Sequence, residues 1–186
     1  MNGATDPNSN GDAMKLRRTL PAALSIAAAL STVLVAAPAQ AFAGGPIINS
    51  GVFGADLRLC LTPNGFDEGA VVTQEQCNGL TGQAWTPVLL DSGSHFNFVS
   101  AGTGKCLDVQ GGRALDHSTI VVRSCNGASG QRWSLQGTPN GAAAELRSGV
   151  AGTNSHCLDL PGNTHTPHAA MQLFTCNNTV AQRWLF

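Results

Sequence analysis

Three cysteine pairs, each followed by a Gln-x-Trp tripeptide, occur in tandem along the chain. The paired cysteines stand 17, 19 and 19 positions apart, and six positions separate the second cysteine from the glutamine in every copy. The copies cover residues 60–85, 106–133 and 157–184. Self-similarity of this kind is typical of folds in which equivalent units share one core. The repeat therefore constrains both the fold and the function of the chain.

Residues 14–41 have the layout of a secretory signal peptide. A basic start precedes an apolar run at residues 20–37, and small residues follow at positions 39–41. We expect cleavage after Ala41, with Ala43 as the alternative, and secretion of the remainder. A transmembrane anchor is the competing interpretation, since about 18 apolar residues can just span a bilayer. Pro21, Pro38 and the small residues after the apolar run favour cleavage over an anchor. We expect no stable membrane insertion after cleavage.

The domain organisation follows from these limits. Residues 1–13 form a polar N-terminal extension, and residues 42–186 are long enough for one domain with a core but too short for two. Within that domain the repeats cover about 50–92, 93–140 and 141–186. One Lys and six Arg face nine Asp and Glu there, so the domain has a charge of about −2. The domain therefore lacks the excess of basic residues that is typical of nucleic-acid binding, and we expect no nucleic-acid partner.

The cysteine count predicts disulfides. An even number of regularly spaced cysteines in an exported chain favours disulfides over metal ligands or catalytic thiols. Six cysteines allow fifteen pairings, and the repeat selects the one within each copy. The expected disulfides are Cys60–Cys77, Cys106–Cys125 and Cys157–Cys176.

The apolar pattern predicts strands. Short apolar runs bounded by Gly, Asn, Pro or Ser recur about every ten residues, which favours an all-β barrel or sandwich. The strands expected in the second and third repeats lie at residues 96–100, 105–109, 120–124, 131–135, 144–148, 156–160, 171–175 and 182–185. Four strands in each of three copies give twelve, with pseudo-threefold symmetry.

The Gln-x-Trp motifs are best interpreted as core. Residues two apart on a strand face the same side, and three symmetry-related indoles can fill a small barrel, each burying roughly 150–250 Å². The buried amides then need internal hydrogen-bond partners. The alternative is that the tryptophans are sugar-stacking platforms. The expected structural core is Gln83, Trp85, Gln131, Trp133, Gln182 and Trp184.

Three tandem copies of Cys-Leu, a second cysteine and Gln-x-Trp resemble the ricin B-chain type of β-trefoil lectin, also known as the family 13 carbohydrate-binding modules. The resemblance covers residues 50–186. It implies a β-trefoil of twelve strands, one disulfide per repeat and one potential sugar pocket per repeat. In lectins of this type an aspartate follows Cys-Leu. An aromatic residue stands two places before the second cysteine, often with Gln four places before it, and Asn commonly precedes Gln-x-Trp.

The third repeat matches this pattern best. Asp159 follows Cys-Leu, and Gln172 and Phe174 stand at the two positions before the second cysteine, while Ala181 replaces the common Asn. We expect Asp159 on the exposed side of a loop, where its charge can strengthen hydrogen bonds to sugar hydroxyls. Phe174 would pack against the apolar face of the ring. In the competing interpretation Asp159 only caps a turn and Phe174 covers the barrel.

The other two repeats depart from the pattern. The second keeps Asp108, a weaker candidate for carbohydrate binding, but has Val121 for Gln, Arg123 for the aromatic residue and Gly130 for Asn. The first repeat has none of the four residues; the positions hold Thr62, Thr73, Glu75 and Gly82. We expect its pocket to be inactive.

The leading hypothesis is a secreted lectin domain that binds a galactose- or xylose-type glycan or polysaccharide, chiefly through the third repeat. The alternative is a β-trefoil whose sugar sites have decayed and which acts as a protein-binding or inhibitor module. No catalytic motif stands out, so we expect no enzyme. We also expect no cofactor and no metal, because His165 and His168 lack a third ligand at a convincing spacing. The pattern does not specify the oligomeric state.

Overall fold

The structure is a computed structural model that describes residues 44–51, 58–91, 95–138, 141, 143–150 and 154–186. The expected extension, the signal peptide and both cleavage positions lie outside the described residues. Among the described residues there is no helix with the length and apolar character needed to cross a membrane.

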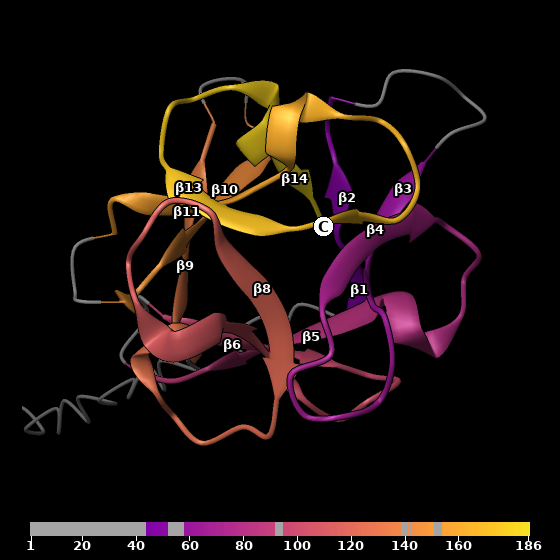
Figure 1. Ribbon diagram of the computed structural model, residues 1–186, viewed down its shortest axis with the longest axis vertical. Coiled ribbons are helices and arrows are strands. Elements are labelled where there is room, and N and C mark those ends of the chain that lie inside the picture. The colour runs from indigo at the N-terminus through magenta and orange to yellow at the C-terminus, as the bar shows by residue number, and fades with distance from the viewer. Residues whose placement is uncertain (1–43, 52–57, 92–94, 139–140, 142, 151–153) are drawn as a thin grey trace, which may run out of the picture. The chain divides into compact units, whose positions relative to one another are not determined.

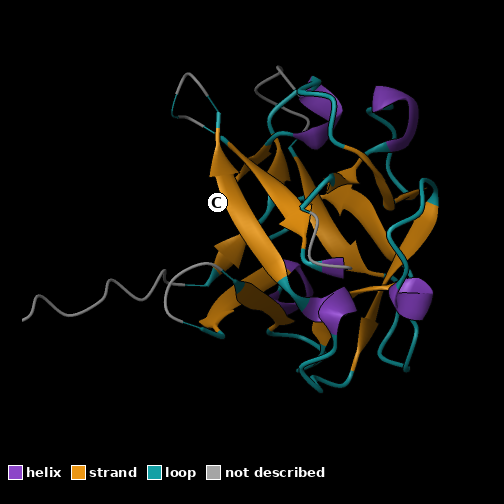
Figure 2. Cartoon of the chain, turned by 90° about the vertical axis from the view of Figure 1, so that its left-hand side faces the viewer, coloured by secondary structure: helices purple, strands orange, loops and turns teal. Residues whose placement is uncertain are grey.

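Short antiparallel strands form the described fold, and its helical segments are single 3₁₀ turns (Figures 1 and 2). The first repeat contains β1 (Gly45–Pro46), β2 (Ile48–Asn49), β3 (Leu59–Pro63), β4 (Val72–Gln76) and β5 (Ala84–Leu89). The second contains β6 (Phe96–Ser100), β7 (Cys106–Val109), β8 (Ser118–Arg123) and β9 (Trp133–Gly137). The third contains β10 (Ala144–Ser148), β11 (His156–Asp159), β12 (Ala169–Ala170), β13 (Gln172–Thr175) and β14 (Trp184–Leu185).

The expected twelve-strand pattern is confirmed with two interruptions. A single residue, Ile47, separates β1 from β2, and Met171 separates β12 from β13, so each pair acts as one interrupted strand. Counted in this way, each repeat has four strands. In Figure 1 the repeats occupy three sectors, with β3 and β4 on the right, β6 and β8 below and β13 and β14 above. The first repeat begins at Gly45, before the boundary expected near residue 50.

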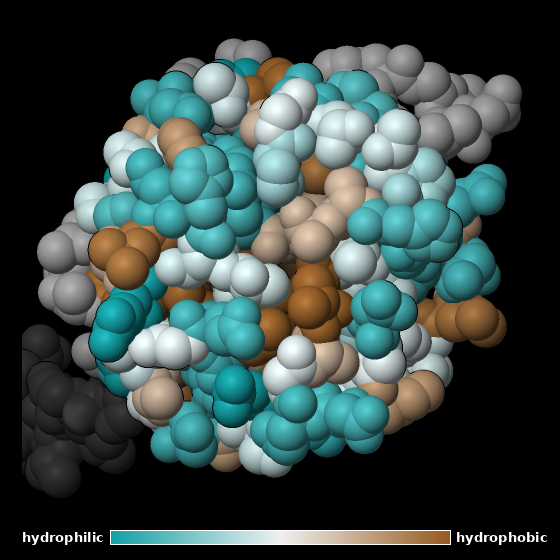
Figure 3. All heavy atoms as spheres, viewed as in Figure 1, coloured by the Kyte–Doolittle hydropathy of each residue, from teal (hydrophilic) through white to brown (hydrophobic). Residues whose placement is uncertain are grey.

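The centre of the fold is apolar, and the three tryptophans lie in it. Trp85, Trp133 and Trp184 are each at most 1% exposed. Each indole N–H donates to the carbonyl of the leucine that follows the first cysteine of its own repeat, at 2.9, 3.0 and 3.1 Å. The polar edge of each buried ring is therefore satisfied, as burial requires. Figure 3 shows a largely hydrophilic face with apolar atoms near its centre.

The glutamines do not begin strands, and in this detail the expected boundaries were wrong. Each ends a 3₁₀ turn: η1 (Thr81–Gln83), η3 (Ser129–Gln131) and η6 (Val180–Gln182). Each side-chain oxygen accepts the backbone N–H of the residue after the second cysteine, at 2.8–2.9 Å. Each side-chain nitrogen donates to the carbonyl before that cysteine, at 2.9–3.0 Å. The amide thus pairs with the hairpin end, and the strand starts after it.

The expected disulfides are present in all three repeats, each with a Cα–Cα distance of 5.1 Å. Each disulfide joins the start of one hairpin strand to a cysteine that lies one or two positions after the end of the other strand. Closing a loop of this size contributes on the order of 3 kcal/mol in the chain-entropy description. The bond therefore holds the hairpin that carries the candidate sugar residues.

A loop of each repeat docks on the next repeat in a cyclic order. The docking residue stands eight positions before the second cysteine and has a left-handed backbone, with φ of 82° at Gly69, 67° at His117 and 70° at His168. Its N–H donates at 2.8–2.9 Å to the carbonyl three positions before the next repeat's second cysteine. The three bonds are Gly69 to Val122, His117 to Leu173 and His168 to Gln74.

Acidic side chains strengthen two of these three contacts. The Glu68 carboxylate accepts the Ser124 N–H at 3.0 Å and its hydroxyl at 2.6 Å. Asp116 in the same way accepts the Thr175 N–H at 2.6 Å and its hydroxyl at 3.0 Å. The third loop has Pro167 at this position, which offers no side-chain acceptor. The repeats are therefore linked to one another by polar contacts as well as through their common core.

Candidate functional site

One glutamine organises the candidate site of the third repeat. Gln182 is 0% exposed, and its Oε1 accepts the Asn177 N–H at 2.8 Å. Its Nε2 donates to the Thr175 carbonyl and to Asp159 Oδ2, both at 3.0 Å. The Gln-x-Trp motif therefore fixes the turn after β13 and also holds the carboxylate of the Cys-Leu-Asp motif.

Asp159 is more buried than the sequence indicated. The expectation of an exposed loop position is wrong, because Asp159 ends β11, is 5% exposed and pairs in register with Gln172 on β13. Its Oδ1 accepts from Gln172 Nε2 at 2.6 Å. An ionised carboxylate offers about four lone-pair sites. The two glutamines use one site on each oxygen, which leaves further lone-pair sites that these glutamines do not use.

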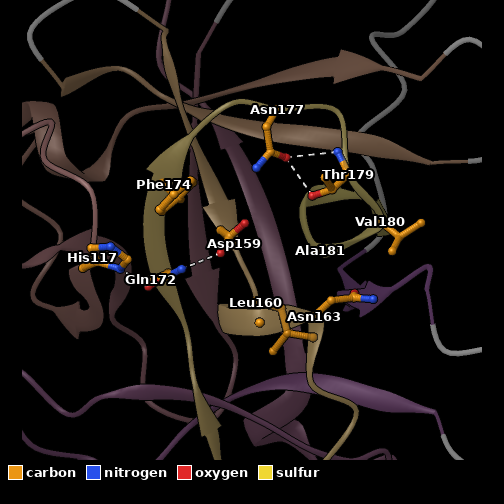
Figure 4. Close-up of a pocket in the computed structure, with 11 residues that line it drawn as sticks. His117, Asp159, Leu160, Asn163, Gln172, Phe174, Asn177, Thr179, Val180 and Ala181 are labelled. Atoms are coloured by element: carbon orange, nitrogen blue, oxygen red, sulfur yellow. Dashed lines mark hydrogen bonds between the residues drawn. The ribbon is translucent and has the colours of Figure 1, made fainter.

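His117 of the second repeat completes the row of polar groups. Its Nδ1 lies 2.9 Å from Gln172 Oε1. Because this oxygen only accepts, Nδ1 carries the hydrogen. The imidazole also meets Phe174 edge to face, with 5.2 Å between ring centroids and an angle of 65°. Figure 4 shows His117, Gln172 and Asp159 in one row with Phe174 beside them.

These residues line a groove of about 510 Å³. Its wall includes the three residues expected from the sequence and residues that the sequence reasoning missed. Ala181, which the sequence comparison placed at the position of the common Asn, also lines the groove. The missed lining residues are His117, Leu160, Gly162, Asn163, Asn177, Thr179 and Val180. The groove combines a buried carboxylate, an amide, an imidazole and a phenyl ring. A small number of convergent polar groups beside an apolar surface is the usual feature of a small-molecule site.

The second repeat has the carboxylate without the rest of the site. Asp108 is 6% exposed and accepts from Gln131 Nε2 at 2.9 Å. The residue opposite is the buried Val121, and Arg123 is exposed. A Cβ added at Gly130 would lie 2.6 Å from Asp108 Oδ1. The asparagine that the resemblance places there therefore requires Asp108 to move.

The buried Asp108 makes a pH-dependent contribution. Burial raises the pKa of Asp108 above its ordinary value of 3.8, against the opposing effects of the Gln131 hydrogen bond and the Arg123 charge. The folded state then binds this proton more tightly than the unfolded state, so stability falls as pH rises through the window above 3.8. In Asp108→Asn we expect this fall to disappear. Urea unfolding at a series of pH values measures the free energy of unfolding as a function of pH. The same pH dependence in the variant and in wild type contradicts the expectation.

The first repeat lacks a carboxylate at the aspartate position and a ring at the aromatic position. Thr62 replaces the aspartate, and its hydroxyl accepts from Gln83 Nε2 at 3.3 Å. Thr73 donates to Glu75 Oε1 at 2.8 Å, and His168 Nδ1 lies 2.9 Å from the other oxygen of Glu75. The acid is thus engaged within the protein, and Glu75 with its threonine and histidine partners fills the position of the stacking ring.

His117 could have been noticed in the sequence only through its partner. It and His168 occupy the same position, eight residues before the second cysteine. This spacing does not reveal that each side chain reaches the following repeat. Only the left-handed backbone and the cyclic docking bring His117 to Gln172.

One cluster of potential metal ligands fails on its chemistry. Glu145, Cys157 and Cys176 each place a ligand atom within 4.8 Å of the others. The two cysteines form a disulfide, however, and zinc binds thiolates rather than disulfide sulfur. This cluster is therefore not a metal site.

The sequence matches the family described as "Ricin-type beta-trefoil lectin domain-like", over residues 56–122 and 82–174. None of the curated proteins matches it. The two overlapping matches together cover more than half of the chain and all three candidate residues of the third repeat.

Solved structures share the fold at low sequence identity. The designed threefold-symmetric protein ThreeFoil has a TM-score of 0.66 and 21% identity, over 75% of this chain and 94% of that chain. A ricin B-like lectin from Macrolepiota procera in complex with lactose has a TM-score of 0.63 and 18% identity, over 78% and 95%. An exo-β-1,3-galactanase from Clostridium thermocellum has a TM-score of 0.67 and 18% identity, over 81% of this chain but 30% of that one.

Proposed function

The chain belongs to the ricin-type β-trefoil lectin domain-like family, and from this premise we propose that it is a secreted, non-catalytic domain that binds carbohydrate. The proposed site is the groove of the third repeat, and the proposed ligand is a galactose- or xylose-type glycan. Three disulfides and the signal-like residues 14–41 support secretion.

One observation supports the third repeat above the others. It alone joins an aspartate, a glutamine and an aromatic ring, Asp159, Gln172 and Phe174, in a groove of about 510 Å³. The carboxylate can accept adjacent sugar hydroxyls, and each charged hydrogen bond contributes about 1.5–3 kcal/mol before losses to solvent. The ring offers an apolar face for the sugar. The equivalent positions elsewhere hold Arg123 or the engaged Glu75.

A galactose-type ligand is supported by likeness rather than by geometry. The Macrolepiota procera lectin is described as a lactose complex, and another similar structure is an exo-β-1,3-galactanase. A single site of this kind binds one sugar weakly. Several linked sites can raise avidity by about 10² to 10⁴ fold, so polymeric glycans are the expected strong ligands.

The test is a glycan array followed by calorimetry on the best ligand. Phe174→Ala should weaken binding about tenfold, which corresponds to about 1.4 kcal/mol, because the sugar loses its apolar contact. The matched control is Arg123→Ala, which changes the equivalent residue of the second repeat and should leave binding unchanged.

Two outcomes contradict the proposal. If neither Phe174→Ala nor Asp159→Ala weakens binding, the groove of the third repeat is not the site. If no glycan binds while a protein copurifies with the domain, the alternative of a decayed sugar site acting through protein contacts replaces it.

A further inference from the structure

A second groove lies where the end of the second repeat meets the third repeat, away from Asp159 and Phe174. We call it the arginine groove. It encloses about 320 Å³ and is lined by Gln136, Gly137, Thr138, Glu145, Arg147, Asn178 and Arg183. It has an equivalent in the first repeat, where a groove of about 240 Å³ includes Pro46, Ile48 and Ala84 at the positions of Glu145, Arg147 and Arg183. The location thus recurs in the fold, while its chemistry changes.

The arginine groove has one positive charge, that of Arg183, for which the described residues supply no acidic partner. Glu145 is 3% exposed, and its Oε2 accepts from Arg147 Nε at 3.1 Å and Nη2 at 2.8 Å. These two charges therefore compensate each other. Arg183 donates to the Asn178 carbonyl at 2.9 Å and forms no ion pair within the described part of the chain.

The second repeat shows what such an arginine binds. Arg132 is equivalent to Arg183, since each lies between the Gln and Trp of its motif. Arg132 Nη2 donates to Asp91 Oδ2 at 2.6 Å. Asp91 belongs to the loop that joins β5 to β6. In the second repeat the protein therefore supplies a carboxylate to this arginine from its own hairpin loop.

The third repeat has the same hairpin without the acid. Trp133 pairs with Phe96, and Trp184 pairs with Ala144, so the two motifs meet equivalent strands. The hairpin loops also close alike. The Leu90 N–H donates to the His95 carbonyl, and the Thr138 N–H donates to the Ala143 carbonyl, both at 2.9 Å. No Asp or Glu occurs in residues 138–143. The position taken by a carboxylate in the second repeat thus lacks one in the third.

We propose that the arginine groove binds the carboxylate of a uronic acid residue in an acidic glycan. Arg183 pairs with the carboxylate as Arg132 pairs with Asp91, and an arginine fork suits that geometry. The amides of Gln136 and Asn178 offer partners for sugar hydroxyls. The turn after Cys176 contributes to both grooves. Asn177 and Thr179 line the groove beside Phe174, which we call the sugar groove, and Asn178 lines the arginine groove. The ligand class rests on the proposed carbohydrate-binding function.

The experiment is an NMR titration of the secreted domain with sodium glucuronate, and with glucose as the neutral counterpart. Glucuronate should shift the signals of Arg183 and its neighbours, and glucose should not. Arg183→Gln should weaken glucuronate binding about 10- to 100-fold, as expected for loss of a charged hydrogen bond. The matched control, Arg132→Gln, removes an arginine that already has a carboxylate and should leave glucuronate binding unchanged.

Further arms separate this proposal from the sugar groove. Phe174→Ala should weaken binding of the neutral glycan but not of glucuronate. Arg183→Gln should weaken binding of glucuronate but not of the neutral glycan. Loss of glucuronate binding in Arg183→Gln, with no neutral glycan bound by wild type, supports the arginine groove and removes the proposed function. Unchanged glucuronate binding in Arg183→Gln overturns the inference, and so does loss of both ligands in this variant. Tighter binding of an acidic peptide than of glucuronate overturns the sugar ligand.

Discussion

Replacement of Trp133 by alanine is expected to lower the free energy of unfolding by about 3–5 kcal/mol. The indole is fully buried among the apolar residues at the centre of the fold, and its N–H satisfies the Leu107 carbonyl at 3.0 Å. The variant leaves a cavity and a buried carbonyl without its donor. Because domains of this size are stable by about 5–15 kcal/mol, the change removes a large part of the total. Urea unfolding followed by circular dichroism measures it.

Phe66→Ala is the control for loss of an aromatic side chain, since Phe66 is 72% exposed. Its expected effect is within about 0.5 kcal/mol, as for other surface substitutions. If Trp133→Ala is as stable as Phe66→Ala, the tryptophan is not part of the core, and its interpretation as a sugar-stacking platform must be reconsidered.

Asp159→Asn is expected to reduce both stability and glycan binding. Two amide nitrogens, from Gln172 and Gln182, donate to the two carboxylate oxygens. Asparagine offers one acceptor and one donor group, so one glutamine would face a donor. Gln182 cannot turn around without losing its bonds to the hairpin end. The loss should be about 1.5–3 kcal/mol in stability, the usual contribution of a hydrogen bond to a charged group, and at least about tenfold in affinity.

Asp108→Asn is the matched control, because Asp108 receives one side-chain hydrogen bond from the described residues, that of Gln131. An asparagine can accept that bond and turn its donor group away. At neutral pH the control should be as stable as wild type or more so, and it should bind glycan normally. Equal losses in the two variants contradict the assigned role of the paired glutamines. Chemical unfolding and calorimetry measure both quantities.

The sequence predicts the architecture because its markers are covalent or deeply buried. The disulfides and the tryptophans recur at fixed spacing, and the strands at residues 96–100 and 144–148 have the predicted bounds. The strand starts expected at Gln131 and Gln182 were wrong because each glutamine ends a 3₁₀ turn and its side-chain amide pairs with the hairpin end. Spacing alone does not distinguish a side-chain amide that pairs with a hairpin from a residue within a strand.

The candidate site was less accessible to sequence reasoning. Asp159, Gln172 and Phe174 are neighbours on one hairpin, so their proximity follows from strand pairing; their role in binding stays a prediction. Asp159 also accepts a hydrogen bond from Gln182, which lies 23 positions later in the sequence and outside the hairpin. His117 enters from another repeat through a left-handed residue. Contacts of this kind depend on tertiary structure and leave no local pattern.

The cyclic docking of the loops means that one repeat is not a portable unit of recognition. The groove beside Phe174 borrows His117 from the preceding repeat, and Asp116 anchors that loop to β13. A third repeat transplanted alone would carry its aspartate, amide and ring but lose one wall of its groove. The smallest fragment with a complete lining is therefore a neighbouring pair of repeats. Evolution can accordingly retune the groove of one repeat by altering the loop of the repeat before it, without touching the aspartate.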